Sequence, residues 1–231
     1  MKDLRTIILA AGKGTRMKSY TPKVLHAVGG KALLSYVLDV ARDVGSLKTC
    51  VVVGHQGDVV RRFLDKGIVA VTQKRLLGTA DAIRSCTNFL KGFRGDVLIL
   101  CVDTPLLRRE TVKQLLVSHR KTKSTATVLT ARVSNPFGYG RVIRNDEGRP
   151  VAIREENDAS DAEKEIDEIN VGVYCFDSRA LAAALKKIKI NSRKKEFYLT
   201  DIFAILAQGS FITAAVEARD ANEGLGVNTR V

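Results

Sequence analysis

What the chain lacks excludes several classes of protein. It has no tryptophan and only five tyrosines, so it offers few of the aromatic platforms on which single-stranded nucleic acids stack, and it contains no recognisable nucleic-acid-reading motif. No window approaches the ~20 apolar residues of a membrane-spanning helix. The N-terminal apolar run TIILAA is too short for a signal peptide. We therefore expect neither a nucleic-acid nor a membrane partner, and a cytoplasmic location.

Metal-ligating and disulfide patterns are also missing. The four cysteines form no CxxC pair, and the three histidines show no ligand spacing. Three of the cysteines lie in apolar, strand-like runs, which favours buried and reduced thiols over a disulfide framework. No serine, cysteine or histidine sits in an activated-nucleophile motif. We therefore expect no zinc site and no covalent catalysis by the protein.

Acidic residues are scarce relative to basic ones, and the net charge is +13. Such an excess favours a polyanionic partner, which could be a nucleic acid, an acidic membrane surface or a phosphorylated small molecule. The alternative is a solvated basic surface. At 231 residues and 45% hydrophobic composition, the chain is long enough for one large domain or two small ones.

Hydrophobic periodicity predicts an α/β fold. Apolar, β-branched runs alternate with amphipathic helical segments in the first half of the chain, and Thr79 is a plausible N-cap for one of those helices. Near-continuous apolar strands indicate a parallel sheet covered by helices on both faces. After about residue 124, strands separated by turn residues predict an antiparallel or mixed extension. We expect a Rossmann-like, mixed and mostly parallel sheet with a small β-rich lobe. The expected strands are 5–10, 48–54, 68–73, 95–103, 124–133, 138–145, 150–156, 169–176 and 210–218, and the expected helices are 31–45, 56–67, 78–90, 108–121, 178–188 and 198–208.

The stretch LAAGKGTRMKSYTPKVLHAV, residues 9–28, directly follows the first strand. Ligands of open α/β sheets bind at the carboxyl ends of strands, so this loop falls in the expected crevice. It is not a dinucleotide fingerprint, because methionine replaces the third glycine, and it does not fit a Walker A loop. Gly12 and Gly14 expose backbone N–H groups that can approach a phosphate closely. Three cations surround them: Lys13, Arg16 and Lys23.

The chain resembles the sugar-1-phosphate nucleotidyltransferases, and most closely the uridyltransferase domain of the bifunctional GlmU family. The resemblance begins with LAAGKGTRM and TPKVLHAVGGK. It continues in order through TQ, LLGTADAI, CVDTPLL, NPFGYGRVIR, EENDAS, EINVGVYCF, EFYLTDI and GVNTR. It therefore covers the whole chain, as a single nucleotidyltransferase domain.

The resemblance implies transfer of the uridylyl group of UTP to N-acetylglucosamine 1-phosphate, with Mg²⁺ as cofactor. It implies that residues from about 1 to 124 bind the nucleotide and that residues from about 125 to 231 bind the sugar phosphate. Arg16, Lys23 and Asp103 are the expected catalytic residues, and Asp103 and Asn228 the expected metal ligands. The expected nucleotide-binding residues are Leu9, Ala10, Ala11, Gly12, Gly14, Lys23, Gln73, Gly78, Thr79 and Asp103. The expected sugar-binding residues are Cys101, Gly140, Glu155, Asn170, Tyr198 and Thr200.

The chain departs from the family pattern at several positions. Leu76 replaces a second glutamine, Cys101 and Val102 precede the metal-binding aspartate, and Asp81 replaces a histidine. The acetyltransferase β-helix repeats of the bifunctional enzymes are absent from this sequence, so we expect no acetyltransferase activity and a monomer, from either an excised domain or a stand-alone enzyme. The alternatives left open are a related transferase with another base or sugar, a non-catalytic nucleotide-sugar sensor and a nucleic-acid binder.

Overall fold

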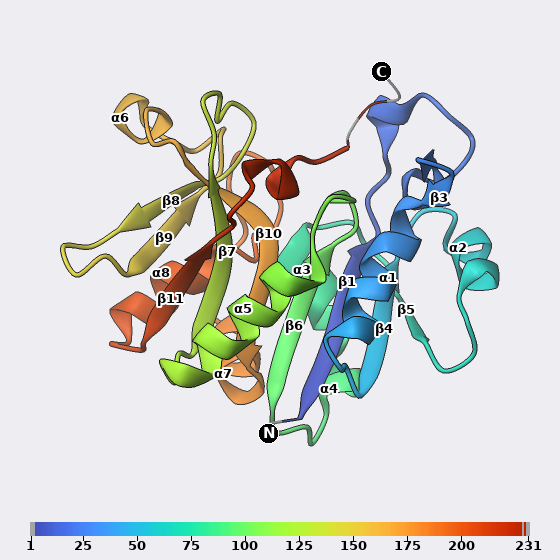
Figure 1. Cartoon of the computed structure of the whole chain (residues 1–231), viewed down its shortest axis with the longest axis horizontal. Helices are drawn as coiled ribbons and strands as arrows, with labels where there is room; N and C mark the ends of the chain where they lie inside the picture. Colours follow the sequence, from blue (N-terminus) through green and yellow to red (C-terminus); the bar gives the residue numbers. More distant parts are fainter. Residues whose placement is uncertain (1–2, 228, 230–231) are drawn as a thin grey trace.

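The computed structural model describes residues 3–227 and 229. Within this part of the chain, nine strands form one sheet whose main path is β11-β7-β10-β6-β1-β4-β5, with the β8–β9 hairpin attached to β10 (Figure 1). Strands β6, β1, β4 and β5 are parallel, β11 is parallel to β7, and β10 runs antiparallel to both of its neighbours, β6 and β7. The strands are β1 (Leu4–Ala10), β4 (Lys48–Val53), β5 (Val69–Thr72), β6 (Asp96–Cys101), β7 (Ala126–Arg132), β8 (Arg141–Arg144), β9 (Pro150–Arg154), β10 (Glu168–Asp177) and β11 (Thr213–Glu217).

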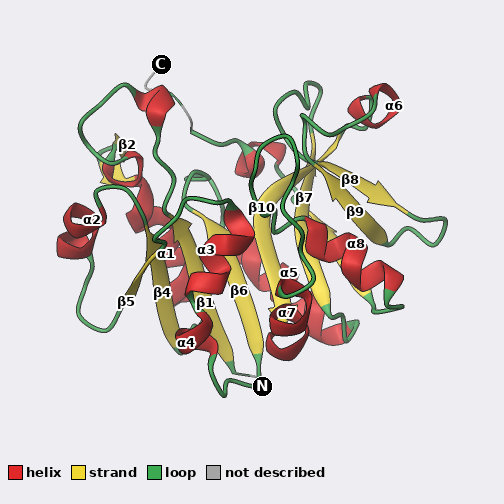
Figure 2. Ribbon diagram, turned by 180° about the vertical axis from the view of Figure 1, so that it is seen from behind, coloured by secondary structure: helices red, strands yellow, loops and turns green. Residues whose placement is uncertain are grey.

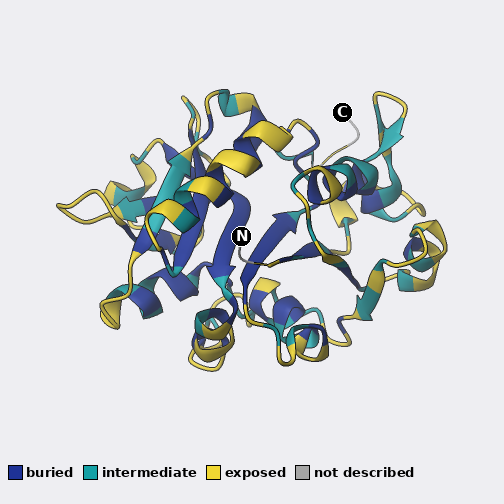
Figure 3. Cartoon of the chain, turned by 60° about the horizontal axis from the view of Figure 1, so that its bottom comes forward, coloured by how far each residue is buried: buried dark blue, intermediate teal, exposed yellow. Residues whose placement is uncertain are grey.

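Helices cover both faces of the sheet. Helices α1 (Leu33–Asp43) and α5 (Arg109–Lys121) pack on one face, against side chains such as Ile8 and Leu98. Helices α3 (Thr79–Ser85), α4 (Thr87–Leu90), α7 (Ser178–Leu185) and α8 (Asp201–Gln208) lie on the other face, which is toward the viewer in Figure 2. Successive strand residues point to opposite faces, so both faces must be apolar. The central strands are accordingly buried, whereas the helices expose their outer sides (Figure 3).

The smaller elements lie at the periphery. They are the β2–β3 hairpin (Ala27–Val28 and Lys31–Ala32), α2 (Gly57–Phe63) and α6 (Asp161–Lys164). Helix α6 begins with a capping box, in which Ser160 and Glu163 each accept a hydrogen bond from the other's backbone N–H. The sheet order and the two helical layers confirm the predicted fold class.

Residues 78–90 differ from the prediction of one helix. The segment forms two helices, α3 and α4, and Thr79 is not an N-cap. Gly78 takes the cap position with a φ of 97°. The Thr79 hydroxyl instead accepts a hydrogen bond from the Leu199 N–H at 2.9 Å. Thr79 therefore fastens the segment before α8 to the start of α3.

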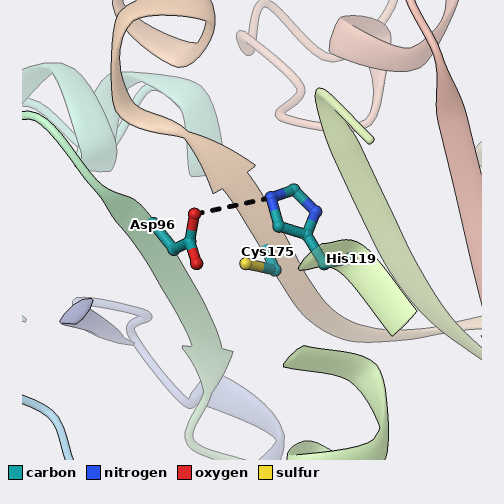
Figure 4. Close-up of side chains that lie close together, drawn as sticks. All are labelled: Asp96, His119 and Cys175. Carbon is teal, nitrogen blue, oxygen red and sulfur yellow. Dashed lines mark ion pairs between the residues drawn. The ribbon is translucent and has the colours of Figure 1, made fainter. Parts of the chain in front are cut away.

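A buried polar cluster fastens α5 to the sheet (Figure 4). Asp96 of β6 is fully buried and accepts a hydrogen bond from the Arg120 Nε at 2.7 Å. The His119 Nε2 lies 3.8 Å from the Asp96 Oδ1, and its Nδ1 lies 2.8 Å from the Thr127 Oγ1. The Cys175 sulfur completes the group, whose potential ligand atoms lie within 4.8 Å of one another. Because the Arg120 guanidinium balances the buried carboxylate, we interpret this cluster as a structural anchor.

The four cysteines are free, and Cys50, Cys86 and Cys175 are buried. Cys101 lies in one of the apolar runs expected to bury its thiol, but it is partly exposed. No described helix has both the length and the apolar composition needed to cross a membrane.

Candidate nucleotide-binding site

A cavity of about 620 Å³ opens at the carboxyl ends of β1 and β6. Five separate segments of the chain contribute to its wall. They supply Leu9, Ala11, Gly12, Lys13, Lys23 and Val24; Gln73, Leu76, Gly78, Thr79 and Ala82; Cys101, Val102 and Asp103; Glu155; and Glu196 and Tyr198.

The two glycines of the first loop have different physical roles. A Cβ on Gly12 would meet no atom within 4 Å, so this backbone is bare where it borders the cavity. Gly14 has a φ of 60°, and a Cβ there would lie only 2.6 Å from the Lys23 Cβ. Glycine at position 14 therefore permits both the left-handed turn and the close packing of Lys23 against the loop.

Lys23 and Asp103 form an ion pair in the lining of the cavity. Their Nζ and Oδ2 atoms are 3.1 Å apart, and the two side chains are 13% and 33% exposed. Asp103 follows β6, and its backbone carbonyl accepts a hydrogen bond from the Val227 N–H at 2.8 Å. The segment that ends at Val227 is therefore hydrogen-bonded to Asp103, the predicted metal ligand.

Gln73 follows β5 and is 5% exposed. Its Nε2 donates to the Gly78 carbonyl at 3.0 Å and to the Asp81 Oδ2 at 2.7 Å. Gly78 packs tightly, since a Cβ on it would lie 2.6 Å from the Phe197 carbonyl oxygen. The amide, the glycine and the segment around Phe197 thus form one wall of the cavity.

Another part of the cavity lining is acidic, at Glu155 and Glu196. Burial raises the pKa of Glu155, the hydrogen bond that it accepts from the Thr200 hydroxyl at 2.8 Å lowers it, and nearby carboxylates raise it further. Tyr198 has its pKa raised to about 12, first by burial and then by Asp158, Glu196 and Glu155. Tyr198 is therefore a neutral phenol that can donate a hydrogen bond at neutral pH.

Glu156, although adjacent to Glu155, has a different environment. Its Oε2 accepts from the Gly138 N–H at 2.9 Å and pairs with the Arg141 Nη1 at 2.9 Å. The Gly138 hydrogen bond and Arg141 lower the pKa of Glu156. Glu156 holds the loop before β8, so of these two adjacent glutamates only Glu155 lines the cavity.

Most of the residues expected from the sequence meet in this one cavity. Eleven of them line it: Leu9, Ala11, Gly12, Lys23, Gln73, Gly78, Thr79, Cys101, Asp103, Glu155 and Tyr198. Other expected residues are described but do not line it: Ala10, Gly14, Arg16, Gly140, Asn170 and Thr200. Asn228 lies outside the described residues.

Two of the expected sugar-binding residues, Gly140 and Asn170, make hydrogen bonds within the protein and do not line the cavity. The Asn170 Nδ2 donates to the Tyr174 hydroxyl at 2.7 Å, and its Oδ1 accepts from the Gly172 N–H at 3.0 Å. The Asn170 backbone N–H bonds to the Gly140 carbonyl at 2.9 Å. Direct contact of Gly140 and Asn170 with a sugar remains a prediction.

The sequence assigned no site role to several lining residues. Lys13 was recognised only as a nearby cation, and Glu196 only as part of the EFYLTDI motif. Leu76 and Val102 also line the cavity, and the sequence singled them out only as departures from the family pattern. Two further apolar residues complete the group: Val24 and Ala82. Their apolar side chains resemble ordinary core residues in the sequence, so only their position in the fold identifies them.

The family match, together with this fold, places the chain among the nucleotidyltransferases. Residues 6–199 match the MobA-like NTP transferase domain, and the chain belongs to this family. The chain is 44% identical over 97% of its length to the bifunctional protein GlmU of Streptococcus mutans, and 45% identical over its full length to that of Pelobacter propionicus. It spans about half the length of these curated relatives, 49% and 50%. The resemblance noted from the sequence motifs is confirmed.

Solved structures share the fold. A UDP-glucose pyrophosphorylase in complex with UDP-glucose superposes with a TM-score of 0.75 at 18% identity, covering 97% of this chain and 94% of that one. A putative glucose-1-phosphate thymidylyltransferase from Bacillus anthracis gives 0.74 at 21% identity, covering 93% and 87%. At these identities the likeness establishes the fold alone.

Proposed function

We propose that the chain transfers the uridylyl group of UTP to N-acetylglucosamine 1-phosphate, forming UDP-N-acetylglucosamine and pyrophosphate. One observation supports this most strongly. A single cavity is lined by a glycine loop with two lysines, by the Gln73 amide and by the carboxyl groups of Glu155 and Glu196. The lysines and backbone N–H groups of the loop can bind the phosphates of both substrates. The Gln73 amide can hydrogen-bond to a pyrimidine, and the carboxyl groups can accept hydrogen bonds from sugar hydroxyls. The similarity to GlmU favours these particular substrates.

In the proposed reaction a phosphate oxygen of the sugar phosphate attacks the α-phosphorus of UTP. The bond to the β-phosphate breaks, and its electron pair leaves with pyrophosphate. Catalysis is then mostly positioning and charge stabilisation. Lys23 is proposed to stabilise the charge on the phosphates, and Arg16 to approach them from the exposed loop. Cys101 does not serve as a nucleophile, because burial and the nearby Asp103 raise the pKa of its thiol.

The donor set at Asp103 fits Mg²⁺. This cation takes one or two carboxylates and completes its shell with water and substrate phosphates. Asp103 borders the cavity as a partly exposed carboxylate, without two further acidic, histidine or cysteine ligands beside it among the described residues. Asn228, next in the chain after Val227, remains the proposed second ligand. A bound Mg²⁺ would neutralise phosphate charge and orient the triphosphate for displacement.

We also propose a division of labour within the domain. Residues from about 1 to 124 supply the glycine loop with Lys23 that binds the phosphates, Gln73 that binds the base, and the metal ligand Asp103. Residues from about 125 to 231 supply Glu155 and Tyr198, whose carboxyl and phenol groups can bind sugar hydroxyls.

Leu76 leaves a second candidate function open. It presents an apolar side chain to the cavity at a position where the GlmU family often has glutamine. That candidate is a related transferase with a different base or sugar phosphate.

A pyrophosphate-release assay tests the proposal. The protein would be given Mg²⁺ with each nucleoside triphosphate and with N-acetylglucosamine 1-phosphate or glucose 1-phosphate. The proposal predicts the highest kcat/KM for UTP with N-acetylglucosamine 1-phosphate. A different preferred pair would establish the second candidate, and no turnover with any pair would instead favour a non-catalytic nucleotide-sugar sensor.

A further inference from the structure

We propose that Asp81 is a positioning residue that sets the pyrimidine selectivity of the site. It holds the Gln73 amide in one orientation, so that the cavity accepts a base with an N3–H group, uracil or thymine, and rejects cytosine. This inference rests on the proposed function only in that a pyrimidine nucleotide occupies the cavity.

The orientation of the Gln73 amide follows from its two partners. The Nε2 lies 3.0 Å from the Gly78 carbonyl oxygen and 2.7 Å from the Asp81 Oδ2. A carbonyl oxygen and a carboxylate oxygen only accept hydrogen bonds. Rotating the amide by half a turn would place the Gln73 Oε1 against both acceptors and would lose both bonds. The two acceptors together therefore fix which end of the amide is the nitrogen.

This arrangement leaves Oε1 as the atom that Gln73 can offer to a ligand. Gln73 lines the cavity although it is almost fully buried. Within residues 3–227 and 229, no donor is recorded for the Gln73 Oε1, and no acceptor for the Gly78 N–H. The cavity wall thus presents a fixed acceptor beside a backbone donor.

Uracil and cytosine differ in what they present to such a wall. Uracil carries a donor at N3 between two carbonyl acceptors, which complements an Oε1 acceptor and an N–H donor. Cytosine carries a lone pair at N3, which would face the Oε1 lone pairs. An amide that could turn over would instead offer Nε2 to cytosine, so selectivity depends on the residue that prevents the turn.

Asp81 is suited to this task by its charge. A hydrogen bond to an ionised acceptor is stronger than one between neutral groups. The resembled family often has histidine at this position, and a neutral imidazole can either donate or accept. The Asp81 carboxylate can only accept hydrogen bonds, so it favours one orientation of the Gln73 amide. Histidine at this position could pair with either orientation.

Binding measurements test the inference directly. Dissociation constants for UTP and CTP, each with Mg²⁺, would be measured by isothermal titration calorimetry on the wild type and on Asp81→Ala and Asp81→Asn variants. Asp58→Ala serves as the control, because Asp58 is also acidic, lies in the first turn of a short helix and does not border the cavity. Circular dichroism would verify that each variant is folded.

The wild type is expected to bind UTP more tightly than CTP. Asp81→Ala should reduce the UTP-to-CTP affinity ratio about tenfold, the factor that corresponds to a hydrogen bond of about 1.4 kcal/mol. Asp81→Asn offers a donor as well as an acceptor, so it should lower the ratio, but by less than Asp81→Ala does. Asp58→Ala should leave the ratio unchanged. A purely structural role for Asp81 would weaken both nucleotides equally.

Two results would overturn the inference. One is a wild type that binds UTP and CTP equally, and the other is an unchanged ratio in a folded Asp81→Ala protein. Pyrophosphate release is measured separately, so a protein that selects UTP through Asp81 but does not turn it over would contradict the proposed catalysis and support the inference.

Discussion

Lys23 and Asp103 are neighbours in space although eighty positions separate them in the chain. Their ion pair places a positive ammonium group and a negative carboxylate side by side. UTP, the sugar phosphate and Mg²⁺ are proposed to bind at this point. The pair depends on a glycine, because a side chain at position 14 would collide with Lys23. At the residue scale, the proposed chemistry therefore depends on one close packing contact as well as on charge.

Replacing Lys23 by alanine should lower kcat about 10²–10³-fold, the range typical of losing one positioned transition-state contact. The reason is that Lys23 is the cation held beside Asp103, whereas Lys13 and Arg16 lie elsewhere on the loop and would not replace it at that position. The pyrophosphate-release assay checks this, and Lys113→Ala is the control because Lys113 is exposed on α5, away from the cavity. Equal rates for Lys23→Ala and wild type would remove Lys23 from the mechanism.

The adjacent residues Glu155 and Glu156 should respond to pH in opposite ways. Burial raises the folded-state pKa of Glu155 above its ordinary value of 4.5, so ionising this group costs stability as the pH rises from 4.5 through the folded pKa. Glu155→Gln should therefore have a higher Tm than wild type above that window, and the difference should vanish below pH 4.5.

The pKa of Glu156 is lowered in the folded protein. Its ionised carboxylate therefore contributes to stability above pH 4.5, and this contribution is lost as the pH falls. Glu156→Gln should have a lower Tm than wild type at neutral pH.

Thermal unfolding of both variants at several pH values tests this pair of predictions. Glu155→Gln should also lose sugar-phosphate binding, if Glu155 accepts from sugar hydroxyls as proposed. Destabilisation by Glu155→Gln at neutral pH would show that the wild-type carboxylate is stabilised in the fold, against this account.

At the scale of elements, α5 is held to the sheet by a buried charge pair as well as by its apolar face. Asp96→Ala should lower the free energy of unfolding by about 3 kcal/mol, because it leaves the partly buried Arg120 without its carboxylate. The matched control is Asp39→Ala, which breaks surface ion pairs with Lys31 and Arg42 and should cost about 1 kcal/mol or less. Urea unfolding measures both changes.

The Asp96 cluster lies at the start of β6, whereas the cavity lies at its end. The folded Asp96→Ala protein should therefore keep the wild-type KM. A loss of stability no larger than that of Asp39→Ala would contradict the role assigned to this cluster.

The sequence predicted the elements well where periodicity and burial agree. The apolar run of β6 is buried along almost its whole length, and α5 was predicted nearly to its observed bounds. The sequence failed where tertiary contacts compete with local signals. Thr79 has the chemistry of an N-cap, yet its hydroxyl bonds to Leu199, 120 positions away. No local pattern contains that contact.

The candidate site was predicted unevenly for a similar reason. Residues in glycine-containing or charged motifs, such as Lys23 and Asp103, were identified from the sequence and do line the cavity. The sequence did not indicate that the Asn170 side chain hydrogen-bonds to Gly172 and Tyr174, or that Asp81 accepts a hydrogen bond from Gln73. Those contacts depend on how individual side chains are oriented in the folded chain, which spacing alone does not reveal.

At the scale of the whole molecule, the net charge of +13 should assist the capture of anionic substrates. We expect kcat/KM for UTP to fall by about threefold or more between low and moderately high NaCl concentration, because salt screens long-range attraction. The value of kcat should change little, since the bound substrates are held by short-range contacts. A salt-independent kcat/KM would show that the basic excess has no part in substrate capture.

The central claim is that one cavity holds the triphosphate on the glycine loop and the pyrimidine on Gln73. A crystal structure of the protein with UTP and Mg²⁺ tests it most directly. The account predicts the triphosphate against Gly12 and Lys23, a metal ion on Asp103 and the uracil N3–H on the Gln73 Oε1. A triphosphate bound away from that loop and from Asp103 would contradict it.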